Sequence, residues 1–291
     1  MLGVRAREGA VYNRAGSGYR SGPAVSTLGR GPMTSDREHS AATPARPTRV
    51  GLVIPALDEE QALPLVLAEL PWDALERVVV VDNGSRDRTA VVARDGGAEV
   101  VAEPIKGYGS ACLAGIAALL EGPDALGSED LIAFCDADHS DFPEDLRAVL
   151  APLHAGRADF VVGSRILGGA DRRALLPQAW FGNRFACLLM QLLFGLRHTD
   201  LGPMRAIRVR ALRHLAMADR DFGWTIEMQL KAHAARLRTV EVPVRYRPRT
   251  GRSKITGTVS GTLGAGYKIL GWILTWRLRS LGRKGRTPSY R

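Results

Sequence analysis

The sequence predicts an α/β fold, a Rossmann-like, doubly wound and mostly parallel sheet, on two observations. Short apolar runs rich in β-branched residues recur from residue 50 onward, and segments with the apolar period of a helix separate them. Continuous apolar strands are typical of sheets covered on both faces, and right-handed helical crossovers join parallel strands. Ligands of such sheets bind at the carboxyl ends of the strands, so we expect the functional residues in the loops there.

The predicted elements follow in chain order. The apolar runs indicate strands at Val50–Ile54, Arg77–Val81, Glu99–Val101, Leu131–Cys135 and Asp159–Val162. The helical period indicates helices between them, at Gln61–Leu70, Arg86–Arg94, Gly109–Leu120 and Glu144–Leu153. Beyond residue 170 the texture changes, and we expect two helices and a short strand, at Trp180–Leu196, Gly223–Arg236 and Thr239–Val244.

Charge divides the chain into three parts. The net charge is +10 over 291 residues, but residues 49–241 alone carry −6, whereas residues 242–291 hold twelve Lys or Arg and no acidic residue. We predict a disordered basic extension over 1–48, a globular domain over 49–254, and a membrane-associating helix with a basic tail over 255–291. A basic tail of this kind attracts an anionic partner, either a lipid surface or a nucleic acid.

The segment Thr258–Trp276 has the length of a membrane helix, with Lys268 as its one charged residue. Several glycines and hydroxyls interrupt it, and basic residues follow it. An amphipathic helix lying on the membrane surface fits this pattern best, and a spanning helix and a core-packing helix are the alternatives. Because the three cysteines form no CxxC pair and no signal peptide is recognisable, we expect a cytoplasmic protein without structural zinc, peripherally bound to the inner face of the membrane.

Two loops at the ends of predicted strands indicate a nucleotide site. Asp82 ends the second strand, where a carboxylate can accept a hydrogen bond from a nucleobase. Lys106 and Gly107 precede the third helix, where glycines let backbone N–H groups approach a ligand and a helix N-terminus favours phosphate. A plain turn with a helix cap is the alternative at both places.

Asp136 and Asp138 are the sharpest feature, because both follow a buried strand directly. Carboxylates at this spacing can present oxygens to one hard cation, Mg²⁺ or Mn²⁺, which keeps open positions for a diphosphate. A helix cap is the alternative, but we expect Asp141 to supply that cap. Arg165 follows the fifth predicted strand at the same edge of the sheet, and its planar guanidinium group can donate two hydrogen bonds to one phosphate.

These motifs occur in the order found in family 2 glycosyltransferases, and the chain resembles most the dolichyl- and polyprenyl-phosphate sugar synthases, bacterial relatives included. The motifs are Pro-Ala-Leu-Asp-Glu at 55–59, Val-Asp-Asn-Gly-Ser-Arg-Asp-Arg-Thr at 81–89, Lys-Gly-Tyr-Gly at 106–109, Asp-Ala-Asp at 136–138 and Gly-Ser-Arg at 163–165. Two later stretches, 200–205 and 248–254, are also similar to that branch. The resemblance runs from about Val50 to Lys254.

The resemblance implies a GT-A fold, a nucleotide-sugar donor and an inverting single displacement assisted by Mg²⁺ or Mn²⁺. By position, Pro55, Glu59 and Asp82 would hold the nucleoside, and Asp136 and Asp138 the metal and the ribose or diphosphate. Arg165 would contact phosphate, and Arg205, Arg252 and Lys254 the acceptor phosphate. Family frequency favours a UDP-sugar over a GDP-sugar.

A polyprenyl phosphate acceptor agrees with the residue chemistry. A hydroxyl acceptor needs a general base, whereas a phosphate is already anionic and needs charge neutralisation. The chain supplies cations for this at Arg165, Arg172, Arg173, Arg205, Arg252 and Lys254. Asp200 and Glu227 are the carboxylates available if a base is required.

Three other functions are alternatives. The same donor chemistry could serve a soluble hydroxyl compound or a glycan. A nucleotidyltransferase would need a Gly-rich, basic N-terminal signature that the chain lacks. A nucleic-acid-binding protein would need a recognition helix or a stacking platform, and since nothing here resembles either, we expect no nucleic-acid partner.

Overall fold

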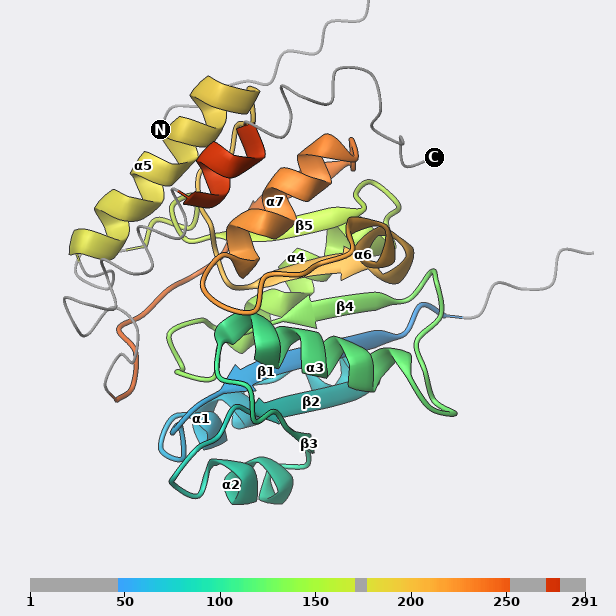
Figure 1. Ribbon diagram of the computed structural model, residues 1–291. Coiled ribbons are helices and arrows are strands. Elements are labelled where there is room, and N and C mark those ends of the chain that lie inside the picture. Colours follow the sequence, from blue (N-terminus) through green and yellow to red (C-terminus); the bar gives the residue numbers. More distant parts are fainter. Residues whose placement is uncertain (1–46, 171–176, 252–270, 278–291) are drawn as a thin grey trace, which may run out of the picture. The chain divides into compact units, whose positions relative to one another are not determined.

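A seven-stranded sheet runs through the part of the chain that the computed structural model describes, residues 47–170, 177–251 and 271–277 (Figure 1). The strand order is β3-β2-β1-β4-β6-β5-β7. The strands are β1 (Val50–Ala56), β2 (Arg77–Asp82), β3 (Glu99–Ala102), β4 (Leu131–Phe134), β5 (Phe160–Ser164), β6 (Arg205–Arg208) and β7 (Thr239–Pro243). Neighbouring strands run parallel except at β6, which is antiparallel to both β4 and β5. The predicted mostly parallel α/β sheet is therefore confirmed.

The apolar runs predict every strand but β6. Two arginines in four residues hide β6 from a search for apolar runs, yet all four residues are buried. Burial is tolerated because both guanidinium groups donate to main-chain carbonyls. Arg205 donates to those of Leu201 and Gly202, and Arg208 to those of Glu129 and Leu153.

Helices cover both faces of the sheet. They are α1 (Leu63–Ala68), α2 (Thr89–Asp95), α3 (Tyr108–Leu120), α4 (Leu146–His154), α5 (Pro177–Phe194), α6 (Val209–Leu215) and α7 (Trp224–Ala234). Side chains of α1, α2 and α4 form one core with Leu52 and Ile54, while those of α3, α6 and α7 form the other with Val53. Successive side chains of a strand point to opposite faces, so apolar residues at every position of β1 fill both layers.

A third, smaller core lies between α5, α7 and the helical segment 271–277, which are side by side in Figure 1. Met190 of α5, Ile226 of α7 and Ile273 are each 0% exposed there. The end of the predicted membrane-associating helix thus packs on the protein. Within the described residues, no helix combines the length and apolar character that crossing a membrane needs.

Residues 1–46 of the predicted basic extension and most of the predicted segment over 255–291 lie outside the described residues, so the predicted domain boundaries stay predictions. Arg172, Arg173, Arg252 and Lys254 lie outside the described residues as well.

Candidate active site

A pocket of about 450 Å³ lies at the carboxyl ends of β1, β2 and β4. Six residues that the sequence analysis selected line it: Pro55, Glu59, Lys106, Gly107, Asp136 and Asp138. The other nine lining residues were not selected there, and they include Asn83, Asp221, Phe222 and Arg249. Segments nearly 200 residues apart in the chain therefore meet around one cavity at the expected edge of the sheet.

Asp82 is the last residue of β2 and is not among the residues that line the pocket. Its Oδ1 accepts a hydrogen bond from the backbone N–H of Ser85 at 2.9 Å, as the turn alternative requires. Its neighbour Asn83 lines the cavity instead. The Asn83 side chain accepts from Gly107 N at 2.8 Å and donates to the carbonyls of Glu103 and Ile105, which fixes the loop before α3. The nucleobase contact of Asp82 stays a prediction.

The glycines at the start of α3, Gly107 and Gly109, leave room for a second loop, the segment 216–223 between α6 and α7. A Cβ atom at Gly107 would lie 2.1 Å from the carbonyl oxygen of Arg220, and one at Gly109 would lie 2.1 Å from that of Asp219. Ser110 N donates to Arg220 O at 2.9 Å. In the structure these glycines let two backbone segments touch, and the predicted approach of a ligand to them stays a prediction.

Asp136 and Asp138 follow β4, as predicted. Tyr108 Oη donates to Asp136 Oδ1 at 3.1 Å, and Asp138 Oδ1 accepts from Ser140 N at 2.9 Å. Burial first, and then the charge of Asp138, raise the pKa of Asp136 to about 7. A cation between the two carboxylates would relieve this repulsion, so the pair fits a divalent metal. Among the described residues no group of three or more His, Cys, Asp or Glu could hold a metal ion.

Asp141 does not cap a helix, contrary to expectation. Neither the 3₁₀ turn Pro143–Asp145 nor α4 has a side-chain hydrogen bond at its N-cap. Asp141 is 1% exposed, and its Oδ1 has no partner among the described residues. Burial, and then the charges of Asp136 and Asp138, raise its pKa well above the usual range. It adds a third carboxyl group behind the pair.

Arg249 is the cation of the pocket that sequence reasoning missed. Its Nη2 lies 3.2 Å from Glu59 Oε1 and 3.3 Å from Asp138 Oδ2, so one guanidinium bridges two loops. Thr250 N donates to Asp138 O at 3.0 Å, which holds the chain after β7 against the carboxylate loop. The one sequence feature that pointed to Arg249 is its place in the stretch 248–254, which resembles the family.

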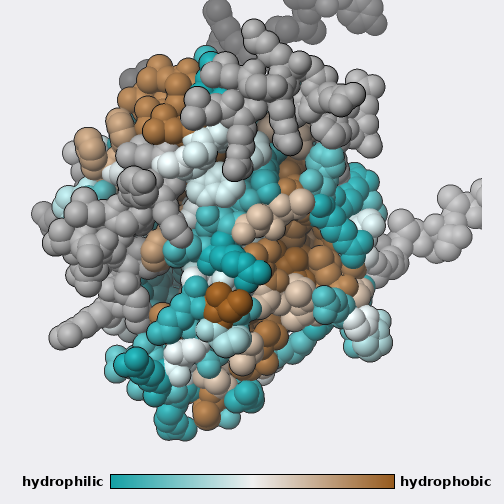
Figure 2. Space-filling model, viewed as in Figure 1, coloured by the Kyte–Doolittle hydropathy of each residue, from teal (hydrophilic) through white to brown (hydrophobic). Residues whose placement is uncertain are grey.

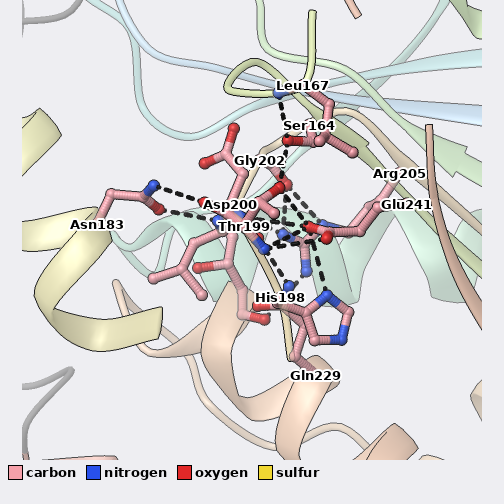
Figure 3. A network of polar contacts seen from close by, with 12 residues as sticks. Ser164, Leu167, Asn183, His198, Thr199, Asp200, Gly202, Arg205, Gln229 and Glu241 are labelled. Atoms are coloured by element: carbon pink, nitrogen blue, oxygen red, sulfur yellow. Dashed lines mark hydrogen bonds and ion pairs between the residues drawn. The ribbon is translucent and has the colours of Figure 1, made fainter. Parts of the chain in front are cut away.

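Arg165 and Asp200 are paired with each other. Arg165 Nε and Nη2 donate to Asp200 Oδ2 and Oδ1 at 2.8 and 2.7 Å, and the guanidinium stacks on the ring of Tyr246. The Asp200 side chain is 0% exposed. Figure 3 shows the network around it, in which Glu241 accepts from the backbone N–H groups of Thr199 and Asp200. Neither predicted catalytic residue lines the pocket in this conformation.

Arg205 and Glu227 are buried supports. Arg205 is 1% exposed and donates to three main-chain carbonyls, those of Leu201, Gly202 and Thr225. Glu227, 0% exposed, accepts from Ala218 N at 3.0 Å and Asp219 N at 2.8 Å and pairs with Lys231 at 2.8 Å. Arg205 is thus engaged with the backbone, and its contact with an acceptor phosphate stays a prediction. The bonds of Glu227 order the 216–223 loop.

Comparison with known proteins agrees with this geometry. The family model described as "Glycosyl transferase family 2" matches residues 52–216. An uncharacterised glycosyltransferase of Mycobacterium tuberculosis, Rv0539, is 40% identical over 74% of this chain and 93% of its own length. A dolichyl-phosphate hexose transferase of Haloferax volcanii is 33% identical over 79% of this chain and 96% of its own.

Among solved structures, glucosyl-3-phosphoglycerate synthase from M. tuberculosis, in complex with Mn²⁺, UDP and glucosyl-3-phosphoglycerate, has a similar fold. The TM-score is 0.64 at 20% sequence identity, over 79% of this chain and 80% of that one. The expected GT-A fold is therefore confirmed. Since the family model covers more than half of the chain, and relatives of one-third identity or more cover most of it, this protein is a glycosyltransferase and a member of glycosyltransferase family 2.

Proposed function

We propose that this protein transfers a sugar from a nucleotide diphosphate sugar, with UDP favoured over GDP, to a polyprenyl phosphate at a membrane surface. The observation that carries the proposal is the pocket of about 450 Å³ that the Asp136–Asp138 pair shares with Lys106 and Arg249. Its size suits a nucleotide sugar. Carboxylates for a metal and cations for a diphosphate line the same cavity, as the donor requires.

Within this pocket each group has a separate task. Pro55 and Glu59 at the end of β1, with Gly107 at the start of α3, border the part that we assign to the nucleoside. Asp136 and Asp138 would hold Mg²⁺ or Mn²⁺, which when bound neutralises charge on the departing diphosphate. Arg249 now pairs with Glu59 and Asp138, and a diphosphate would compete for that guanidinium.

The reaction proposed is a single displacement. An anionic oxygen of the acceptor phosphate forms a bond to the anomeric carbon, while the bond from that carbon to the donor diphosphate breaks and the diphosphate leaves with the electron pair. No proton has to be removed from the acceptor. This agrees with a site whose two candidate bases, Asp200 and Glu227, are both 0% exposed and already paired.

Two observations support the choice of a lipid acceptor. The name of the similar dolichyl-phosphate hexose transferase indicates a lipid phosphate of this kind as its acceptor. In addition, α5 exposes an apolar stripe of Phe181, Phe185, Leu188 and Leu192 at helical spacing, seen as brown surface over α5 in Figure 2. Exposed Leu274 lies on the adjoining segment 271–277.

We assign this stripe to a lipid surface rather than to another protein, because cations accompany it. Arg184 stacks on Trp180 within α5, and Arg277 lies over Phe194 at its end. Basic side chains beside apolar ones are typical of helices that lie on anionic membranes. Leu192→Glu should reduce co-flotation with vesicles of anionic phospholipid by about tenfold. Leu65→Glu, at an exposed leucine of α1, is the matched control, and equal flotation of both variants would refute the assignment.

The function is tested by product analysis with purified protein, Mn²⁺ or Mg²⁺, a short polyprenyl phosphate and a panel of UDP- and GDP-sugars. We expect nucleoside diphosphate release that requires both metal and lipid phosphate. Asp138→Asn should abolish it, whereas Asp124→Asn, at an exposed carboxylate between α3 and β4, should not. Transfer to a soluble hydroxyl compound or a glycan without the lipid would refute the acceptor and keep the donor. Release of pyrophosphate would indicate a nucleotidyltransferase.

A further inference from the structure

The loop 216–223 forms one wall of the donor pocket. Asp221 and Phe222 line the cavity, and the preceding backbone rests on the glycines of α3 through the Ser110 N to Arg220 O hydrogen bond. This wall contains no regular secondary structure. Its position therefore depends on that backbone bond and on side-chain contacts.

Asp219 supplies those contacts. Its Oδ1 accepts hydrogen bonds from Asp221 N at 2.8 Å and Gly223 N at 3.0 Å, which closes the loop into a turn directly behind the lining residues. Its Oδ2 accepts from Trp272 Nε1 at 2.5 Å. One carboxylate thus joins the pocket wall to a segment about fifty residues further along the chain.

Trp272 also packs tightly against the loop. A Cβ atom at Gly223 would lie 2.3 Å from Trp272 Nε1, so only glycine leaves room for the indole there. The next residue, Ile273, is fully buried in the core between α5 and α7. The indole is therefore held from both sides, by the loop and by the anchored segment.

We propose that Trp272 is a positioning residue for the donor site. Its hydrogen bond to Asp219 sets the wall that Asp221 and Phe222 present to the nucleotide sugar, so that the seating of segment 271–277 on α5 and α7 governs donor affinity. The inference rests on the proposed donor site and adds the C-terminal segment to it. Trp272 acts through Asp219 and lies outside the set of residues that line the pocket.

The test compares Trp272→Phe with Trp276→Phe. Both tryptophans belong to the same segment and pack in the same small core, with ring centroids 6.3 Å apart. Of the two, Trp272 is the one that donates a hydrogen bond to the loop in the described part of the chain. Titration of UDP in the presence of Mn²⁺, with GDP in parallel, gives the Kd of each variant. We expect Trp272→Phe to raise Kd about tenfold, equivalent to about 1.4 kcal/mol, and Trp276→Phe to leave it within about twofold.

A second readout follows the loop without any nucleotide. Hydrogen exchange of the Asp221 and Gly223 amides in the ligand-free protein should accelerate in Trp272→Phe and in Asp219→Asn, and stay unchanged in Trp276→Phe. Equal Kd values for the two tryptophan variants, in a protein that binds UDP or GDP, would overturn the inference and leave the proposed function standing. A wild-type protein that binds neither nucleotide would refute the donor site itself, and with it the role of Trp272.

Discussion

Replacing Gly109 by alanine should separate the 216–223 loop from α3. The new Cβ would lie 2.1 Å from the carbonyl oxygen of Asp219 and 2.8 Å from backbone atoms of Asp219 and Arg220, a clash that no side-chain rotation can relieve. Overpacking of this kind costs about 1–3 kcal/mol. Loss of the Ser110 N to Arg220 O hydrogen bond adds about 1 kcal/mol. Alanine has a higher helix propensity than glycine by up to about 1 kcal/mol, which offsets part of this cost. We therefore expect the free energy of unfolding to fall by about 1–3 kcal/mol in total.

Two other glycines provide the comparison, assayed by urea unfolding and by UDP titration. Gly115→Ala, also in α3, meets Val53 and Val81 side chains at 2.5 and 3.0 Å and should lose a similar amount of stability without changing Kd for UDP. A Cβ atom at Gly182 in α5 would meet nothing within 4 Å, so Gly182→Ala should raise the free energy of unfolding by about 0.5–1 kcal/mol. Gly109→Ala alone should weaken UDP binding. The reasoning fails if Gly109→Ala unfolds at the urea concentration of the wild type, or if Gly115→Ala weakens UDP binding as much.

Two further predictions concern charge. Asp200→Ala removes the partner of the Arg165 guanidinium, which is only 13% exposed. The substitution should lower the free energy of unfolding, measured in urea, by about 3–5 kcal/mol. A loss below about 1 kcal/mol would contradict the buried pair. Because the pKa of Asp136 is raised to about 7, the folded state holds that proton more tightly than the unfolded state, and the stability of the metal-free protein should fall as pH rises from about 4 to about 7. Mn²⁺ binds the ionised carboxylates, so adding Mn²⁺ should raise Tm more at about pH 8 than at about pH 5.5. Asp138→Asn should abolish this rise in Tm at both pH values. An equal rise at both pH values in the wild type would contradict the metal pair.

Most of the sheet could be predicted from the sequence because most of its strands contain a short run of apolar residues. In β1, for example, Leu52 and Ile54 enter one core and Val53 the other, and such a run has few alternatives to a strand covered on both faces. β6 could not be predicted. Its arginines are stabilised by carbonyl groups of Leu201, Glu129 and Leu153, and no local pattern records those contacts.

The residues of the candidate site also divide into those that a local sequence pattern predicts and those that it does not. Asp136 and Asp138 were predictable because they end a strand, and the ends of parallel strands meet at one edge. Asp221, Phe222 and Arg249 were not, since each lies in a loop that reaches the pocket only through long-range contacts. The contact of Arg249 with Glu59, for instance, joins positions 190 residues apart.

The roles assigned to Asp200 and Glu227 show what residue type alone leaves out. A carboxylate near an active-site motif is a candidate base, but a base must lose and gain a proton in contact with substrate. Both carboxylates are 0% exposed, and each already accepts several hydrogen bonds and pairs with a cation. Glu227 fixes the backbone at Asp219, and Asp219 in turn bonds to Trp272. Glu227 therefore acts on the proposed donor site through the loop that it orders. For this reason a substitution at Glu227 should change nucleotide affinity before it changes the chemistry of transfer.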